Sequence, residues 1–240
     1  MILRTAAHSD IGHVRSENED SYLCDDQHRL YAVADGIGGL PAGKEASELS
    51  IKSLEETFAA MQPASRTDYL HCLDEINASV FQLGRTLNSR LGIGTTLTVA
   101  HLSDSEIRIL HVGDTSLFRL RAGRLEKLTT DHILENEMQE RLARGESMLM
   151  LLENRQALTR CVGQPPPIIG DYCSLLLQAG DRYLLCSDGI TRAASIQQIE
   201  STVSQAASPQ ACVQTLIDHS NACGGLDNAT VVAIFVDSLE

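Results

Sequence analysis

The sequence lacks features that mark several common classes of protein. Only 19 of its 240 residues are Lys or Arg, against 32 Asp and Glu, so the formal net charge is -13. A chain with this charge repels nucleic-acid backbones and anionic membrane surfaces. No apolar run reaches the roughly 18 residues of a membrane helix, and the N-terminal residues lack the basic and apolar regions of a signal peptide. We therefore expect a cytoplasmic protein that binds neither nucleic acid nor membrane.

Soft-metal and disulfide chemistry are not indicated either. The seven cysteines include no CxxC pair, and none has a histidine at zinc-binding spacing. Most of them lie in apolar runs such as 183–186, which is typical of buried free thiols in a reducing compartment. The eight histidines include no HxxxH pair.

What the sequence has instead is a set of short acidic motifs. They are RSENED at 15–20, DGIGG at 35–39, DG at 188–189 and DN at 227–228. Each motif adjoins an apolar run that is typical of a strand, so the carboxylates lie at strand ends, where a fold can gather them around cations. The pattern indicates a metal-dependent hydrolase.

Hydrophobic periodicity predicts both helices and strands, without an internal repeat. Apolar runs bounded by turn residues predict strands at 30–34, 95–102, 106–112, 116–121, 172–177, 182–186 and 229–236. The second, third and fourth of these are expected to form an antiparallel meander. Amphipathic spacing predicts helices over 42–61 and 69–87. A late helix is expected to start at Ser208-Pro209 and to end at Gly224-Gly225.

These elements favour sheets packed together with helices outside, in one domain over residues 1–240. The exception is an excursion, or flap, expected at about 131–158. It contains the apolar patch 148–152, which is either the core of the flap or a docking surface. Asp131-His132 at the start of the flap is expected to cap a helix. The alternative is that these two residues form a family-like element that precedes the flap.

Six motifs in one order resemble the PP2C-type (PPM) metal-dependent serine/threonine protein phosphatases, in their compact bacterial form. In chain order they are RxxNED (15–20), DGxGG (35–39), GTT (94–96), VGD (112–114), SDG (187–189) and DN (227–228). Asp-Gly alone is chiefly a turn dipeptide, but six motifs in one order are hard to obtain by chance. The resemblance implies an α+β fold, in which a central sandwich of two antiparallel β-sheets is flanked by α-helices on both sides (four-layer αββα).

The resemblance also implies a centre of two Mn2+ or Mg2+ ions. Such hard cations prefer carboxylate and carbonyl oxygens, so the expected ligands are Asp35, the Gly36 carbonyl, Asp188 and Asp227. Asp35 is the expected catalytic bridge between the ions, which would activate water for attack on phosphorus. Arg15 offers a planar fork to the phosphate oxygens and is the expected phosphate-binding residue.

Other residues near these ligands are assigned supporting roles. Glu19 and Asp20 are expected to hold metal-bound waters, and Asn228 is expected to be a turn residue that orients Asp227. Arg15 and Glu19 also have the i,i+4 spacing of a helical surface ion pair, which is the alternative for both.

Asp114 has two equally supported interpretations, as a hairpin residue and as a ligand of a third, weaker metal. Thr95 and Thr96 are most simply strand residues. Two residues depart from the family pattern, because Ile37 and Leu40 stand where many relatives have a histidine, so the resemblance supplies no histidine general acid.

A further departure is Thr115-Ser116, where the family frequently has Ser-Arg. The expected function is metal-dependent hydrolysis of phosphoserine and phosphothreonine in proteins, by a monomer that opposes a bacterial Ser/Thr kinase. The alternative is a catalytically silent module that binds a phosphoprotein or kinase. A two-metal nuclease has similar ligands, but the net charge opposes it.

Overall fold

The described part of the chain folds into two β-sheets and six helices. The computed structural model describes residues 1–87, 92–146 and 154–239. The strands are β1 (Ile2–Asp10), β2 (Asp20–Asp25), β3 (Leu30–Asp35), β4 (Leu97–Leu102), β5 (Glu106–Val112), β6 (Ser116–Arg121), β7 (Arg124–Lys127), β8 (Asp171–Leu176), β9 (Arg182–Cys186) and β10 (Ala229–Ser238). The helices are α1 (Gly43–Met61), α2 (Arg66–Thr86), α3 (Leu134–Ala143), α4 (Asp188–Thr191), α5 (Ile196–Gln205) and α6 (Pro209–Ala222).

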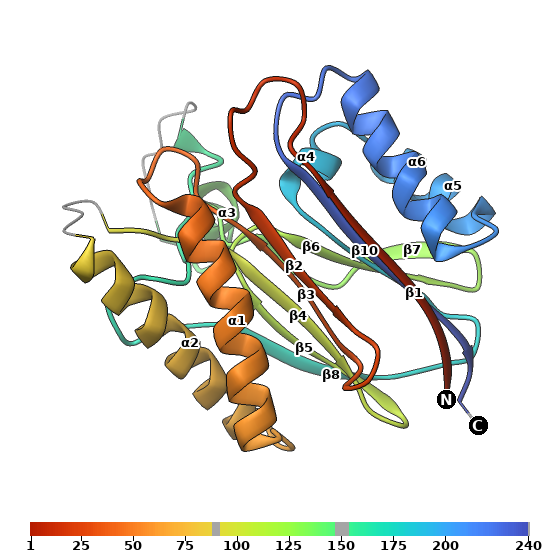
Figure 1. The fold of residues 1–240 in the computed structure, drawn as a ribbon, viewed down its shortest axis with the longest axis horizontal. Coiled ribbons are helices and arrows are strands. Elements are labelled where there is room, and N and C mark those ends of the chain that lie inside the picture. Colours follow the sequence, from red (N-terminus) through yellow and green to blue (C-terminus); the bar gives the residue numbers. More distant parts are fainter. Residues whose placement is uncertain (88–91, 147–153, 240) are drawn as a thin grey trace.

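The two sheets pack face to face between two layers of helices. Sheet A has the strand order β1-β10-β9-β6-β7, sheet B has the order β2-β3-β4-β5-β8, and neighbouring strands are antiparallel. Helices α1 and α2 cover the outer face of sheet B, and α5 and α6 cover that of sheet A (Figure 1). The predicted α+β fold with an αββα arrangement is confirmed.

Strand β10 shows how the sequence produces these layers. Its odd-numbered residues from Val231 to Phe235 pack against the helices, and its even-numbered residues from Val232 to Val236 pack between the sheets. Side chains alternate between the faces of a strand, so an uninterrupted apolar run identifies a strand that is buried on both faces. Burying each Val, Ile or Phe side chain in this way stabilises the fold by about 1.5–3 kcal/mol.

The helix termini agree with the sequence where capping residues are clear. Ser208 Oγ accepts a hydrogen bond from Ala211 N, and Pro209 occupies the first turn of α6. Helix α2 begins at Arg66, three residues before the predicted start. The reason is a capping box, in which Ser65 and Asp68 each accept a backbone hydrogen bond from the other.

The predicted meander is wrong at its third strand. Strands β4 and β5 pair, but β6 pairs with β9 and β7 in sheet A. The chain crosses between the sheets at Gly113, which has φ +109, and buried Thr115 then bonds Thr98 through their hydroxyls at 2.6 Å. A glycine turn between two apolar runs is equally typical of a hairpin and of such a crossing, so the pattern alone does not separate them.

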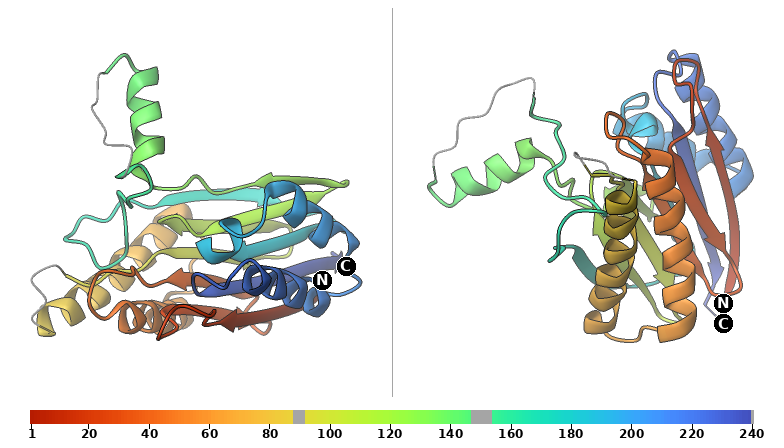
Figure 2. Two further views of the ribbon diagram at one scale, coloured as in Figure 1. Left: turned by 90° about the horizontal axis from the view of Figure 1, so that it is seen from above. Right: turned by 60° about the vertical axis from the view of Figure 1, so that its left-hand side comes forward.

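The excursion near 131–158 contains α3, which projects away from the sandwich (Figure 2). No residue of α3 is buried. The predicted cap at Asp131-His132 is wrong, because Ile133 precedes the helix and the Asp131 carboxylate binds Lys127 Nζ at 2.6 and 2.7 Å. The apolar patch 148–152 lies outside the described residues. In the described ranges, no helix is long and apolar enough to cross a membrane.

Substitution of Gly113 tests the crossing between the sheets. A Cβ at this position would lie 2.6 Å from Thr96 Cβ, at a φ that side chains rarely adopt. We expect Gly113→Ala to lower the free energy of unfolding by about 2–4 kcal/mol. Gly123 is the matched control, since it also has positive φ but no atom within 4 Å of the added Cβ. Urea denaturation should give a cost of only ~1 kcal/mol for Gly123→Ala, and equal costs would contradict a steric role for Gly113.

Candidate active site

The strand pairings bring the acidic motifs to one end of the sandwich. Asp20, at the start of β2, pairs with Asp35, at the end of β3. In sheet A, β9 ends beside the start of β10, so Asp188 and Asp227 become neighbours. The end of β5 carries Asp114 to the same end, because Val112 pairs with Leu97 at the start of β4. Antiparallel pairing thus gathers residues that are distant in sequence.

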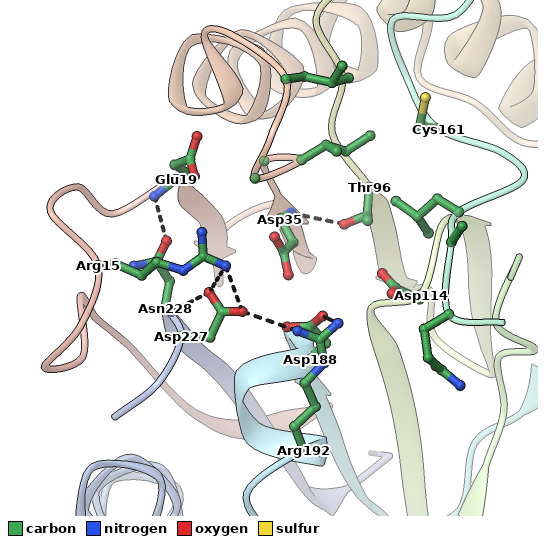
Figure 3. Close-up of a pocket in the computed structure, with 17 residues that line it drawn as sticks. Arg15, Glu19, Asp35, Thr96, Asp114, Cys161, Asp188, Arg192, Asp227 and Asn228 are labelled. Atoms are coloured by element: carbon green, nitrogen blue, oxygen red, sulfur yellow. Dashed lines mark hydrogen bonds and ion pairs between the residues drawn. The ribbon is translucent and has the colours of Figure 1, made fainter. Parts of the chain in front are cut away.

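These motifs surround a cavity of about 490 Å³ (Figure 3). Eight of the predicted site residues line it: Arg15, Glu19, Asp35, Gly36, Asp114, Asp188, Asp227 and Asn228. The side chains of Asp35, Asp114, Asp188 and Asp227 approach a common space from different elements. Asp20 does not line the cavity and is buried behind it.

Asp35 is held by the two threonines of the GTT motif. Thr96 Oγ1 accepts a hydrogen bond from Asp35 N at 2.9 Å, and Thr96 N donates to Asp35 O at 2.8 Å. Thr95 Oγ1 donates to the same carbonyl at 2.9 Å. Strand β4 starts two residues later than predicted, and Thr95 forms only isolated β-bridges with Gly36 and Val162. Both threonines are thus more than strand residues, because they fix the backbone of Asp35.

Asp20 connects the two sheets beneath the cavity. Its Oδ2 accepts a hydrogen bond from Ser187 Oγ at 2.7 Å, and the same hydroxyl accepts one from Thr230 N. The Oδ1 of Asp20 is buried without a hydrogen-bond partner. A buried carboxylate oxygen without a partner costs free energy unless a cation or a proton offsets its charge.

Asn228 fixes the loop that carries Arg15. Its Nδ2 donates to the carbonyls of Ile11 and Glu17 at 2.9 and 3.0 Å, and its Oδ1 accepts from Glu19 N at 2.9 Å. Its backbone N also donates to Asp227 Oδ1 at 2.9 Å. Asn228 therefore does more than shape a turn, since it ties the RSENED loop to the start of β10.

Arg15 pairs with Asp227, which is distant in sequence. Its Nη2 lies 2.9 Å from Oδ1 and 3.0 Å from Oδ2 of that carboxylate. The segment around Arg15 consists of turns, so the alternative of a helical ion pair with Glu19 is wrong. The Glu19 carboxylate points instead toward Gly43, the first residue of α1. Its Oε1 lies 2.4 Å from the position that a Cβ on Gly43 would occupy.

Two glycines allow the backbone segments of the site to approach closely. A Cβ on Gly189 would lie 2.0 Å from the carbonyl oxygen of Asn228. A Cβ on Gly36 would lie 2.4 Å from the carbonyl oxygen of Gly43. Side chains at these positions would push Asp188 away from Asp227 and Asp35 away from α1.

Burial and mutual repulsion favour the protonated forms of the central acids. Burial, followed by the charges of Asp20 and Asp188, raises the pKa of Asp35 well above its usual range. Burial also raises the pKa of Asp20 to about 6 and that of Asp188 to about 7, the latter in spite of nearby Arg192. Burial raises the pKa of Asp114 as well. A dication would relieve this repulsion, because it favours the ionised carboxylates.

Asp114 lies where the chain crosses between the sheets, so the hairpin interpretation is wrong. The adjacent Gly113 N donates to His132 Nδ1 at 3.1 Å, and His132 N donates to Gly113 O at 2.8 Å. His132 therefore connects the base of the flap to the backbone beside Asp114. The role of Asp114 as a ligand for a third metal stays a prediction.

Sequence reasoning missed Arg192, which follows α4. Its Nη2 lies 2.6 Å from Asp188 Oδ2, and its Nη1 lies 3.2 Å from Asp227 Oδ2. The spacing of four residues from Asp188 to Arg192 is a detectable pattern, but it is also common on exposed helices. The second carboxylate comes from a distant segment, which no local pattern reveals.

The donor atoms around the cavity suit hard dications. The acidic lining residues offer carboxylate oxygens and Gly36 offers a carbonyl oxygen. Behind Asp35, the buried Oδ1 of Asp20 has no hydrogen-bond partner, which fits an oxygen that a cation or a metal-bound water satisfies. In their present conformations, however, no three His, Cys, Asp or Glu side chains of the described residues are grouped closely enough to hold a metal ion. Instead, the guanidinium groups of Arg15 and Arg192 hold the carboxylates of Asp188 and Asp227.

One side of the cavity is apolar and contains neither of the family's histidines. Ile37 and Leu40 both line the cavity. Among the described residues that line it, there is no histidine. Ile37 and Cys161 meet over Gly94, where an added Cβ would lie 2.9 Å from Ile37 Cδ1 and 3.3 Å from Cys161 Sγ. The flap contributes the adjoining segment 156–158 to the lining.

The chain resembles known phosphatases over nearly its whole length. Residues 12–224 match the protein phosphatase 2C family. The protein phosphatase PhpP of Streptococcus pneumoniae is 30% identical over 233 residues, with 94% of each chain covered. The PPM Ser-Thr phosphatase MsPP of Mycobacterium smegmatis, solved in complex with cacodylate, is 34% identical with a TM-score of 0.81, and 97% of each chain is covered.

A third relative was solved with metal. The catalytic domain of the serine/threonine protein phosphatase PstP, in complex with two manganese ions, is 32% identical with a TM-score of 0.78, covering 98% of this chain and 99% of that one. The protein described here belongs to the protein phosphatase 2C family, as its six motifs predict.

The raised carboxyl pKa values predict how stability depends on pH. Since the pKa of Asp188 is about 7 in the folded state and about 3.9 when unfolded, its contribution to stability is lost as pH rises through 7. We therefore expect the melting temperature of the metal-free protein to fall as pH rises from 6.5 to about 7.5, where both states become ionised, and to change little from there to pH 8.5. The buried His101 and His111 do not interfere, because burial lowers their pKa to about 4 and about 3.

Millimolar Mn2+ should reverse this fall, and it should raise the melting temperature more at pH 8.5 than at pH 6.5. Differential scanning fluorimetry with EDTA or Mn2+ measures both effects. In the control variant Asp188→Asn, the pH dependence of the metal-free protein should be weaker. A flat pH profile in the wild type, with no response to Mn2+, would exclude repulsion among ionised acids.

Proposed function

We propose that this protein hydrolyses phosphoserine and phosphothreonine in proteins by a metal-dependent mechanism. The observation that carries the proposal is the convergence of Asp35, Asp188 and Asp227 on one cavity beside Arg15. Membership of the protein phosphatase 2C family identifies the enzyme class as protein-serine/threonine phosphatase. A catalytically silent binding module is not favoured, because the relatives are named as phosphatases.

Two dications, Mn2+ or Mg2+, would be held by the carboxylates of Asp35, Asp188 and Asp227 and by the Gly36 carbonyl. Asp35 occupies the central position and would contact both ions. The two manganese ions in the PstP relative support this number. When bound, such ions activate water for attack on phosphorus and offset the charge of the phosphate oxygens. Asp114 would contribute to a third, weaker site.

The chain's own residues orient the substrate and the ligands. The side chain of Arg15 is 37% exposed and has a planar guanidinium that can turn from Asp227 to two oxygens of a phosphate group. Asn228 keeps Arg15 in place through the loop carbonyls that it binds. Glu19, which lines the cavity, would orient metal-bound waters, and the partnerless Oδ1 of buried Asp20 would accept a hydrogen bond from another such water.

Protonation of the leaving alkoxide falls to water, since no histidine lines the described cavity. The substrates would include a Ser/Thr kinase that the phosphatase opposes. The cytoplasmic location, the monomeric state and the single domain spanning residues 1–240 with its flap stay predictions.

Hydrolysis of p-nitrophenyl phosphate and of phosphoserine and phosphothreonine peptides tests the proposal. We expect activity in Mn2+ or Mg2+ and none in EDTA. Asp188→Asn should reduce kcat by at least about 100-fold, because it removes a charged ligand. Circular dichroism would show that the variant is folded. Full activity in Asp188→Asn would remove this residue from the mechanism, and hydrolysis in EDTA would exclude a metal-dependent reaction.

Replacement of Arg15 tests phosphate binding separately. Arg15→Ala should raise KM for a phosphothreonine peptide by about tenfold, because a charge-assisted hydrogen bond contributes roughly 1.5–3 kcal/mol. Arg15→Lys, which keeps the charge but not the fork, should recover part of the loss. Steady-state kinetics at saturating Mn2+ measures the change, and an unaltered KM would restrict Arg15 to its pair with Asp227.

A further inference from the structure

Arg192 is the residue whose side chain joins two of the proposed metal ligands. It contacts Asp188 Oδ2 through Nη2 at 2.6 Å and Asp227 Oδ2 through Nη1 at 3.2 Å (Figure 3). The two carboxylates belong to different segments, one at the start of α4 and the other just before β10. Arg15 also binds Asp227, but its ion pair does not reach Asp188.

The charge of Arg192 offsets part of the repulsion in the cavity. Its guanidinium opposes the rise in pKa that burial and neighbouring acids cause at Asp188, and it acts in the same direction on Asp114. A single side chain thus acts on three acids that line the cavity. In this respect it has the same electrostatic effect as a bound cation, although with one positive charge rather than two.

We propose that Arg192 is a built-in competitor for the metal, which holds Asp188 and Asp227 together in the metal-free protein and leaves them when a dication binds. This inference rests on the proposed function, because it takes both carboxylates to be metal ligands. Carboxylate oxygens that are paired with a guanidinium are less available to a metal ion. An arginine that stays in place would also repel that ion by its positive charge. Arg192 therefore lowers the affinity of the site for metal.

The position of Arg192 allows this exchange. Its side chain is 58% exposed, whereas those of Asp188 and Asp227 are only 16% and 20% exposed. An exposed guanidinium can turn into solvent at small cost, because the ion pairs of exposed side chains contribute little to stability. The carboxylates stay in place, since Asn228 N holds Asp227 and α4 carries Asp188.

Titration calorimetry with Mn2+ at pH 8 tests the proposal. We expect Arg192→Gln to bind Mn2+ roughly three- to tenfold more tightly than the wild type, because two ion pairs no longer compete. Arg192→Lys keeps the charge but not the two-pronged contact, so its gain should be smaller. Arg124→Gln on β7, outside the cavity, makes the same change in net charge and should bind as the wild type does.

Thermal unfolding gives a second readout that does not depend on catalysis. Without metal, Arg192→Gln should melt at a lower temperature than the wild type, because the acids lose a counter-charge, and saturating Mn2+ should close the difference. Unchanged or weaker Mn2+ binding by Arg192→Gln would overturn the proposal, as would an equal gain in Arg124→Gln. If the wild type binds no Mn2+, the proposed function fails together with this inference. If only the variants disagree, the proposed function stands.

Discussion

The structure is organised around mutual repulsion between carboxylates that share one partly buried cavity. Asp35, Asp188 and Asp227 come from three separate segments, and only the pairing of β2 with β3 and of β9 with β10 brings them together. Burial raises the free energy of the ionised forms of Asp35 and Asp188, so positive charge at this point stabilises the fold. In the described chain, Arg15 and Arg192 supply it. In the proposed enzyme, metal ions replace part of that charge.

The parts of the fold that follow from the sequence are those that depend on local patterns. The apolar run of β10 and the cap at Ser208-Pro209 were predictable, because strand burial and helix capping are determined by residues close in sequence. The sequence does not predict β1, since exposed His8 and half-exposed Ser9 interrupt its apolar periodicity. It does not predict β2 either, where apolar and acidic residues are mixed. The position of β6 depends on a contact between Thr115 and Thr98, which no local pattern reveals.

The same distinction applies to the site. Acidic residues at strand ends were visible as motifs, and eight of the predicted residues line one cavity. The contribution of Ser187, Thr96 and Arg192 was not visible, because each acts through a partner far away in sequence. Asp20 shows the limit clearly. The motif identified the residue, but only the structure places it behind the cavity as a link between the sheets.

The close contact at Gly189 has a consequence for any redesign of this centre. Since a Cβ there would come within 2.0 Å of the Asn228 carbonyl oxygen, main chain lies directly against main chain at this point. The separation of the main chain at Asp188 from that at Asp227 is therefore restrained by direct backbone packing. Exchanging one ligand for a longer or shorter one would move one carboxylate, whereas moving the two ligand-bearing segments apart for a larger ion would require rebuilding the junction between α4 and β10.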